Sequence, residues 1–286
     1  MKIWVTGATG FVGRHVVHEL LQRGHSVTAI ARDAARAQAM PWARQATFIV
    51  CDLITDHAKL LSEHALPDAL VHLAWPGLPN YRNFFHVGTN LRSDLKFLPA
   101  AVAAGIPQIM VAGTCLEYGM QNGPLAEDFA TVPHTPYGFA KDTLRKSLQM
   151  LQQEHPFTLQ WMRLFYMFGE GQNPNSLLAH LDRAIDQGDA VFNMSMGDQL
   201  RDYLPIEEVA VNFVLALQHP AICNGIINCS SGRPTSVVDL VTRRCIERGS
   251  GIRLNRGHFP YADYEPMAFW GVPVKLNEAR NASRAR

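Results

Sequence analysis

Short, strongly apolar runs alternate with longer amphipathic stretches over the first half of the chain. Runs of this length indicate buried strands, and they fall at 2–8, 25–32, 46–53, 69–75, 108–114 and 157–169. The stretches between them predict helices at 10–24, 54–65, 86–105 and 137–154. Strands this apolar are buried on both faces, as in parallel sheets whose strands are joined by helices. The pattern therefore predicts an α/β fold with a doubly wound parallel sheet.

The pattern changes after residue 168, where Gly, Pro, Asn and Met become more frequent and strands are harder to recognise. We interpret 1–168 as the main domain and expect 203–228 to return to it. The remainder of 169–286, namely 169–202 and 229–286, is expected to form a smaller, partly interleaved domain. Sheets of this kind bind ligands outside the carboxyl ends of their strands, and the smaller domain is expected to bind the substrate.

Composition and charge narrow the class of protein. Of the 286 residues, 47% are hydrophobic and 18% are charged, an ordinary globular balance. The formal net charge of +1 indicates neither a nucleic-acid nor an anionic-membrane partner. No apolar run is long enough to cross a bilayer and no signal peptide precedes the first strand, so we expect a cytoplasmic protein. Five cysteines without a C-x-x-C pair, and histidines without metal-ligand spacing, predict reduced thiols and no metal site.

A glycine-rich loop joins the first strand to the first helix. In VTGATGFVGRHV the glycines are Gly7, Gly10 and Gly13. The first permits a tight turn, the second lets a pyrophosphate approach backbone N–H groups at the helix N-terminus, and the third lets helix and strand pack closely. This context predicts a Rossmann-type dinucleotide site. The whole loop is expected to contribute to it: Gly7, Thr9, Gly10, Phe11, Val12 and Gly13.

The end of the second strand bears on the choice of dinucleotide. An acidic residue there would accept hydrogen bonds from a ribose 2′-hydroxyl and repel a 2′-phosphate. The strand instead ends at Arg32, and Arg36 follows one helical turn later. Asp33 lies slightly too far along the chain to accept hydrogen bonds from the ribose. Because an arginine can fork onto a phosphate, we expect NADP(H), with NAD(H) as the second choice. Asp52 and Leu53, which end the third strand, are placed to meet the adenine, although Asp52 could equally cap the next helix.

Eight spaced motifs follow one another over about residues 1–240: TGATGFVG, CDL, VHLAW, GTNLRSDL, GTCLEYG, PYGFAK, RLFYMFGEGQ and RDYLPIEEVA. Together they resemble the extended short-chain dehydrogenase/reductase family, whose members are mostly nucleotide-sugar epimerases, dehydratases and reductases. The tail YADYEPMAFWGVPVKL resembles the end of the branch that acts on nucleotide-linked 4-keto-6-deoxyhexoses. The resemblance implies a nucleotide-sugar substrate.

The resemblance also implies three catalytic residues. Tyr137 matches the family's tyrosine, Lys141 its lysine, and Thr114 the residue whose hydroxyl contacts the reacting oxygen. A phenol has a reference pKa of about 10, and a lysine one helical turn away, together with an oxidised nicotinamide, would favour its ionised form. Cofactor contacts are implied for Leu73, Ala74, Trp75, Asn90, Tyr137, Lys141 and Phe165, and substrate contacts for Thr114, Glu117, Tyr166, Asn175 and Arg201.

Departures from the family pattern narrow the reaction. Family 4,6-dehydratases carry an Asp–Glu pair directly after the catalytic threonine, and Cys115 and Leu116 stand there in this chain. Neither can protonate a leaving hydroxyl, so 4,6-dehydration is disfavoured. Glu117 follows one residue too late, and contacts either a substrate hydroxyl or a structural hydrogen-bond donor.

Further departures concern the substrate pocket. Tyr166 stands where many family members have asparagine, and we expect its phenol either to reshape the sugar pocket or to pack as a buried side chain. Arg201 matches a family arginine that binds the nucleotide diphosphate. Ala262 stands at the best-aligned position of a second such arginine, and Arg253 or Arg256 could replace it.

These residues predict an NADPH-dependent 4-ketoreductase of a nucleotide-activated 4-keto-6-deoxyhexose, with Tyr137 as the proton donor. The alternative is an NAD-dependent nucleotide-sugar 4-epimerase that uses the same residues. A third interpretation is a non-catalytic dinucleotide-sensing protein, although such proteins commonly lose the Tyr–Lys pair. We also expect a homodimer through the helices at 86–105 and 137–154, the pair that family relatives join into a four-helix bundle between subunits.

Overall fold

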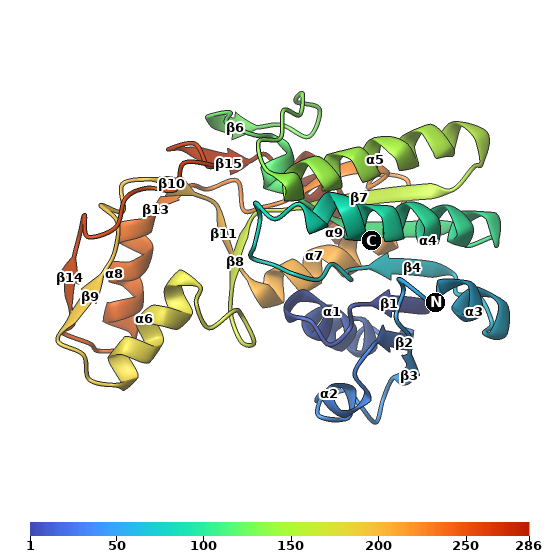
Figure 1. The fold of residues 1–286 in the computed structure, drawn as a ribbon, viewed down its shortest axis with the longest axis horizontal. Helices are drawn as coiled ribbons and strands as arrows, with labels where there is room; N and C mark the ends of the chain where they lie inside the picture. Colours follow the sequence, from blue (N-terminus) through green and yellow to red (C-terminus); the bar gives the residue numbers. More distant parts are fainter. Residues whose placement is uncertain (286) are drawn as a thin grey trace.

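A seven-stranded parallel sheet forms the centre of the larger part of the molecule (Figure 1). We describe residues 1–285 from a computed structural model. The strands pair in the order β12-β7-β5-β4-β1-β2-β3. Their bounds are β1 (Lys2–Thr6), β2 (Ser26–Ala31), β3 (Thr47–Val50), β4 (Ala69–His72), β5 (Gln108–Thr114), β7 (Thr158–Leu164) and β12 (Gly225–Cys229). The order reverses between β1 and β4, which is where such sheets bind ligands. The predicted fold class is confirmed.

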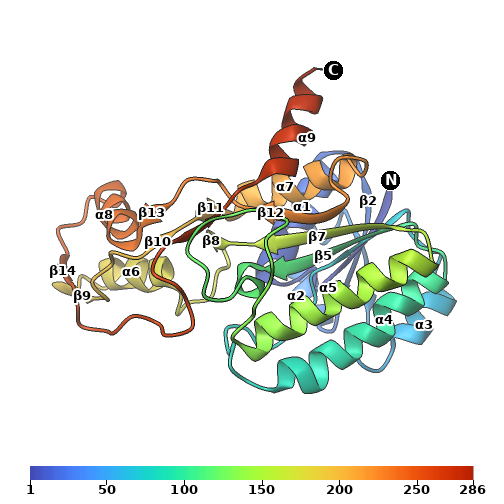
Figure 2. The ribbon, with the colours of Figure 1, turned by 90° about the horizontal axis from the view of Figure 1, so that it is seen from above.

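Helices cover both faces of this sheet, as the apolar character of the strands predicts. Figure 2 shows α4 and α5 side by side along one face, with α1 and α7 on the other. The helices of this part are α1 (Phe11–Gln22), α2 (Ala34–Gln38), α3 (His57–Glu63), α4 (Arg92–Ala103), α5 (Pro136–Glu154), α7 (Ile206–Gln218) and α9 (Val274–Arg284). A π-helical segment, η1 (His86–Leu91), leads directly into α4, so the predicted helix at 86–105 consists of two parts.

Alternate residues of each strand face different cores. Val5 of β1 belongs to the core under α1 and α7, which contains Val17 and Phe213. Its neighbour Trp4 belongs to the core under α4 and α5, which contains Phe97. Because both faces of each strand are buried in this way, the strand sequences are apolar throughout instead of alternating.

The smaller part of the molecule holds short strands and two helices, seen at the left of Figure 1. Its elements are β8 (Tyr166–Phe168), α6 (Leu177–Asp186), β9 (Val191–Asn193), β10 (Leu200–Arg201), β11 (Tyr203–Pro205), β13 (Thr235–Ser236), α8 (Val237–Glu247) and β14 (Arg253–Asn255). Two further strands, β6 (Gly123–Leu125) and β15 (Phe269–Gly271), pair with each other. The division into domains at residue 168 stays a prediction.

Two sequence-based boundaries are wrong. The single strand predicted at 157–169 is two strands, because β7 ends at Leu164 and β8 leaves the main sheet to pair with β11. The helix predicted at 54–65 spans only 57–63 as α3. Within residues 1–285, no helix combines the length and the apolar character that crossing a membrane requires.

Candidate active site

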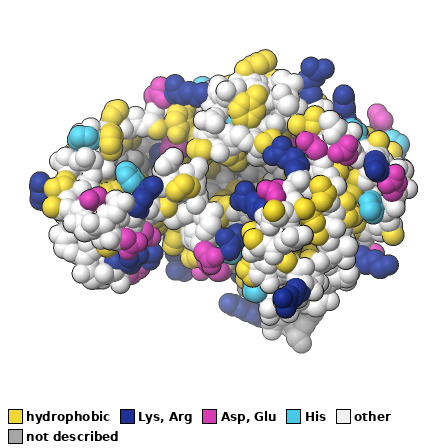
Figure 3. All heavy atoms as spheres, turned by 60° about the horizontal axis from the view of Figure 1, so that its bottom comes forward, with side chains coloured by type: hydrophobic (Ala, Val, Ile, Leu, Met, Phe, Trp, Pro, Cys, Tyr) yellow, Lys and Arg dark blue, Asp and Glu magenta, His cyan; other side chains and the backbone are white. Residues whose placement is uncertain are grey.

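A cavity of about 820 Å³ opens at the carboxyl ends of the sheet strands. The space-filling view shows the molecule hollowed between its larger and smaller parts (Figure 3). Of the residues predicted to bind cofactor or substrate, the following line it: Gly7, Thr9, Gly10, Phe11, Val12, Gly13, Arg32, Asp52, Leu53, Leu73, Ala74, Trp75, Asn90, Thr114, Tyr137, Phe165 and Tyr166. The other four, Lys141, Glu117, Asn175 and Arg201, lie outside the lining.

Three glycines make the loop between β1 and α1 possible. Gly7 has a φ of +63°, and a Cβ there would lie 2.7 Å from the backbone nitrogen of Ala74. A Cβ on Gly13 would lie 2.2 Å from the carbonyl oxygen of Gly7. Gly10 is the N-cap of α1 and brings no capping side chain. The first N–H groups of α1 are therefore available to an anion in the cavity, the arrangement by which helix N-termini bind phosphates.

Positive charge lines the cavity beyond β2. Arg32 and Arg36 both belong to its wall, and the carboxylate of Asp33 between them accepts a hydrogen bond of 2.9 Å from the backbone N–H of Arg36. Asp33 is thus the N-cap of α2. At the end of β3, Asp52 lines the cavity and accepts a hydrogen bond from the backbone N–H of Ile54 at 3.0 Å. The alternative role of Asp52 as a helix cap is not observed, because α3 begins after Asp56.

Tyr137 and Lys141 lie one turn apart at the start of α5. The N-cap Thr135 fixes this start by accepting a hydrogen bond from Gly138 N–H at 3.1 Å. Burial raises the pKa of the Tyr137 phenol far above its ordinary value, and the nearby Thr114 side chain opposes this only in part. Burial also lowers the pKa of Lys141 to about 8, against the opposing charges of Asp94 and Glu117. Without a cofactor the site therefore holds a protonated phenol.

Aromatic rings enclose the Tyr137 phenol. The ring of Tyr81 lies 5.5 Å from it, that of His86 5.2 Å and that of Trp75 6.0 Å, measured between centroids. Lys141 does not line the cavity, and its Nζ lies 3.8 Å from the centre of the Trp75 ring.

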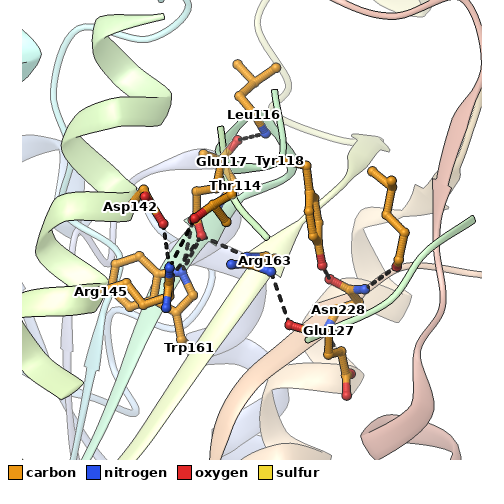
Figure 4. A network of polar contacts seen from close by, with 12 residues as sticks. Thr114, Leu116, Glu117, Tyr118, Glu127, Asp142, Arg145, Trp161, Arg163 and Asn228 are labelled. Atoms are coloured by element: carbon orange, nitrogen blue, oxygen red, sulfur yellow. Dashed lines mark hydrogen bonds and ion pairs between the residues drawn. The ribbon is translucent and has the colours of Figure 1, made fainter. Parts of the chain in front are cut away.

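Glu117 is fully buried, and its carboxylate lies in a polar network with Thr114, Trp161 and Arg163 (Figure 4). One carboxylate oxygen accepts hydrogen bonds from the backbone N–H of Thr114 at 2.8 Å and from Trp161 Nε1 at 2.9 Å. The other accepts from Arg163 Nε at 2.8 Å, and Arg145 Nε lies 3.7 Å away. Of the two alternatives that the sequence left open, the structure shows the structural hydrogen bonds, because the carboxylate is fully buried and both its oxygens accept from protein donors.

Arg201 is buried behind Glu265 and does not reach the cavity. Its guanidinium donates to the Glu265 carboxylate at 3.1 Å and to the carbonyl oxygens of Leu200 and Met267 at 2.9 and 3.2 Å. Glu265 itself lines the cavity. Arg201, which was expected to bind the diphosphate, is therefore paired with the Glu265 carboxylate in this structure.

Two other expected substrate contacts take different positions. Asn175 is exposed on the loop before α6, and its neighbours Asn173 and Ser176 line the cavity in its place. The suggested replacements for the second arginine do not line the cavity either. Arg256 pairs with Asp198 at 2.7 Å, and Arg253 is exposed on β14.

A family model described as the NAD dependent epimerase/dehydratase family matches residues 3–230 of the chain. The chain belongs to this family. The resemblance predicted from the eight motifs is confirmed. The chain is accordingly an NAD(P)-dependent enzyme.

Relatives in the family have more than one activity. The dTDP-6-deoxy-L-talose 4-dehydrogenase (NAD(+)) of Aggregatibacter actinomycetemcomitans is 32% identical over 276 residues, which cover 95% of this chain and 100% of that protein. A UDP-glucose 4-epimerase of Azospirillum brasilense is 29% identical over 282 residues, covering 87% and 78% of the two chains.

Solved structures share the fold of the family. A UDP-glucose-4-epimerase from Stenotrophomonas maltophila with bound NAD and formylated UDP-arabinopyranose has a TM-score of 0.85 at 22% identity, covering 100% of both chains. MoeE5 in complex with UDP-glucuronic acid and NAD has a TM-score of 0.82 at 24% identity, covering 98% of this chain and 92% of that one. At this level of identity the likeness establishes the fold alone.

Tyr81 and Glu265 are among the lining residues that the sequence did not predict. Tyr81 follows a Pro-rich stretch, and its backbone oxygen accepts a hydrogen bond from Tyr137 N–H at 3.1 Å. Glu265 lies in the YADYEP segment, 64 residues after Arg201. No local pattern therefore predicts that it pairs with Arg201.

Proposed function

We propose that the chain reduces the C4 carbonyl of a nucleotide-linked 4-keto-6-deoxyhexose with a reduced nicotinamide dinucleotide. The relative at 32% identity is named as a dTDP-6-deoxy-L-talose 4-dehydrogenase, and its similarity extends over the whole of that protein. Oxidation of a 6-deoxyhexose at C4 and reduction of the corresponding 4-keto sugar are one reaction in opposite directions. The similarity thus supports this chemistry at C4.

The position of Tyr137, on the cavity wall and one helical turn before Lys141, is the observation that carries the proposal. A bound reduced nicotinamide supplies the hydride. The alkoxide oxygen that forms at C4 then needs a proton, and burial keeps the Tyr137 phenol protonated. The Thr114 hydroxyl, which ends β5 beside this phenol, would orient the carbonyl oxygen. Lys141, one turn along α5, would hold the nicotinamide ribose and assist the loss of the phenolic proton.

The surroundings of Thr114 argue against dehydration. Cys115 and Leu116 follow it, both buried, and burial raises the pKa of the Cys115 thiol. The only carboxylate of this segment, Glu117, is turned away into its ion pair with Arg163. Removal of a hydroxyl group needs a proton donor at the leaving oxygen, and neither of the first two residues is suited to that role.

The 4-epimerase is the second candidate, favoured by the similarity to the UDP-glucose 4-epimerase of Azospirillum brasilense. An epimerase must turn its keto sugar so that both faces meet the nicotinamide. The rings of Tyr137 and Tyr81 lie 5.5 Å apart between centroids, and the bulky Tyr166 also lines the cavity. Bulky rings around the reacting oxygen restrict such a turn, which supports the reductase.

For the cofactor we propose NADP(H). The support is the pair Arg32 and Arg36 on the cavity wall, since two guanidinium groups suit a 2′-phosphate. The named relative uses NAD(+) by its printed name, and MoeE5 is described with NAD. NAD(H) is therefore the alternative, in which the free oxygen of Asp33 would accept from the ribose.

We also propose a homodimer through α4 and α5. These helices lie side by side on one face and expose apolar side chains, among them Leu95, Phe139 and Met150. Burying such residues between subunits would stabilise an association. Sedimentation at micromolar concentration tests this, and a monomer there would contradict it.

The activity is tested by mixing the enzyme, NADPH or NADH, and a dTDP-linked 4-keto-6-deoxyglucose while following the absorbance of the reduced nicotinamide. We expect stoichiometric oxidation of the cofactor. Tyr137→Phe should lower kcat by about 10²- to 10⁴-fold, the usual contribution of a general acid. Tyr261→Phe, at a tyrosine outside the cavity lining, is the matched control and should retain activity. No net oxidation, with NAD retained on the purified protein, would favour the epimerase.

A further inference from the structure

The buried ammonium group of Lys141 rests against an indole ring instead of a carboxylate. Its Nζ lies 3.8 Å from the centre of the Trp75 ring, and the residue is 2% exposed. The two nearby acids are engaged elsewhere: Asp94 with His72 Nε2 at 2.9 Å, and Glu117 with Arg163 Nε at 2.8 Å. The aromatic face is thus the close contact of this cation, well within the range of a cation–π interaction.

The plane of the indole is held by His86. Trp75 Nε1 donates a hydrogen bond to His86 Nδ1 at 3.0 Å, and the two rings lie nearly parallel, 15° apart. His86 Nε2 lies 3.1 Å from the carbonyl oxygen of Asn80. Because a carbonyl oxygen only accepts and an indole N–H only donates, Nε2 carries the hydrogen and Nδ1 accepts. The contacts therefore require the neutral form of His86, and burial, which lowers its pKa, agrees with this.

Several charged and titratable groups surround Lys141, and together with burial and the Trp75 ring they determine its pKa. Tyr137 lies on the same helix, His86 on η1, Asp94 on α4 and Glu117 in the short 3-10 helix η2 (Cys115–Glu117). Burial lowers the pKa of Lys141 to about 8, while Asp94 and Glu117 oppose this from a distance. An aromatic face attracts the charged form of an amine and not the neutral form. The Trp75 ring therefore favours the ammonium state that burial disfavours.

We propose that Trp75 is a positioning residue for Lys141, whose charged ammonium it holds beside the part of the cavity where a nicotinamide ribose would bind. Trp75 lines the cavity, and Lys141 Nζ packs against its ring. His86 keeps the ring in the plane that this contact requires. The inference rests on the dinucleotide binding of the proposed function, but it does not depend on the sugar substrate or the direction of the reaction.

The test is the pH dependence of dinucleotide binding without sugar, measured by calorimetry at pH 6.5 and pH 8 with whichever of NADPH and NADH binds more tightly. In Trp75→Leu the ammonium loses its aromatic face, so the pKa of Lys141 falls further. We expect binding to weaken about tenfold at pH 8 and less than about threefold at pH 6.5. Trp75→Phe keeps an aromatic ring but loses the hydrogen bond to His86. Its binding affinity should therefore lie between those of the wild type and Trp75→Leu. Trp270→Phe, at a tryptophan outside the cavity lining, should match the wild type.

A double-mutant cycle distinguishes two roles of Trp75: positioning Lys141, or only packing in the cavity wall. In a Lys141→Met background, Trp75→Phe should have little further effect at pH 8, because the charge that it would position is absent. Weakening that is equal at both pH values, or equal in both backgrounds, would show that Trp75 only shapes the wall and would overturn the proposal. Both comparisons, between pH values and between backgrounds, remain valid if the sugar reaction proves to be an epimerisation. If Trp75→Leu fails to fold, both can be made with Trp75→Phe.

Discussion

The two ends of the cavity are built in different ways. The cofactor end comes from the loop after β1 and from the first residues after β2 and β3, so each motif is contiguous in the chain. The sugar end joins Tyr81, Thr114, Tyr166 and Glu265, which come from four separate segments. Its ion pair between Arg201 and Glu265 spans 64 residues of sequence. A contiguous motif predicts its own geometry, whereas a site assembled from distant segments depends on the whole fold.

The two ends also differ in how their cations are compensated. Arg32 and Arg36 reach the cofactor end on the surface of the cavity, where an anion can meet them. Arg201, at the sugar end, is 5% exposed in its side chain and already holds Glu265. On the proposed function, the cofactor end presents exposed arginines that a phosphate could meet. At the sugar end, a diphosphate that used Arg201 would have to displace a carboxylate.

The largest expected effect is at Glu117, whose carboxylate accepts a hydrogen bond from the backbone N–H of Thr114. Glu117→Gln keeps the size of the side chain but leaves Arg163 buried without its counter-ion. We expect the free energy of unfolding to fall by ~3–5 kcal/mol, the usual cost of removing one partner of a buried ion pair. Urea denaturation measures it.

The matched control for Glu117 is an exposed pair. Glu247 is 62% exposed and lies 3.2 Å from Arg244. Glu247→Gln should change the stability by less than ~1 kcal/mol, as is usual for surface pairs. Equal effects of the two substitutions would mean that the network in Figure 4 does not hold the sugar end together.

The same contrast explains what the sequence could and could not predict. The sheet, its helices and the glycine loop follow from local patterns, because apolar runs and glycine spacing are properties of neighbouring residues. Arg201 was expected to face a diphosphate, since nothing nearby in sequence reveals that Glu265 folds back onto it. The position of Glu117 was left open for the same reason. Its partner Arg163 lies 46 residues away on β7.

A smaller effect is expected at Glu265. Glu265→Gln removes the charge that compensates Arg201, but the site lies on the cavity wall, where water can reach part of it. We expect a loss of ~1–3 kcal/mol in the free energy of unfolding, the cost of an imperfectly paired polar group. The nucleotide sugar should restore more stability in this variant than in the wild type, because its diphosphate can then reach Arg201. Equal restoration in thermal unfolding experiments would mean that Arg201 does not bind the diphosphate.

The smallest effect is expected at the exposed cations of the cofactor end. Arg32→Ala should reduce the preference for NADPH over NADH by about tenfold, the lower range for a hydrogen bond to a charged group, because solvent screens an exposed arginine. Arg44→Ala removes an exposed arginine outside the cavity lining and should leave the preference unchanged. The effect of Arg32 should also shrink as salt is added. If the wild type binds NADH at least as tightly as NADPH and Arg32→Ala changes neither, the arginine does not bind a 2′-phosphate. Asp33 then becomes the residue to substitute, since a ribose hydroxyl would need its carboxylate as an acceptor.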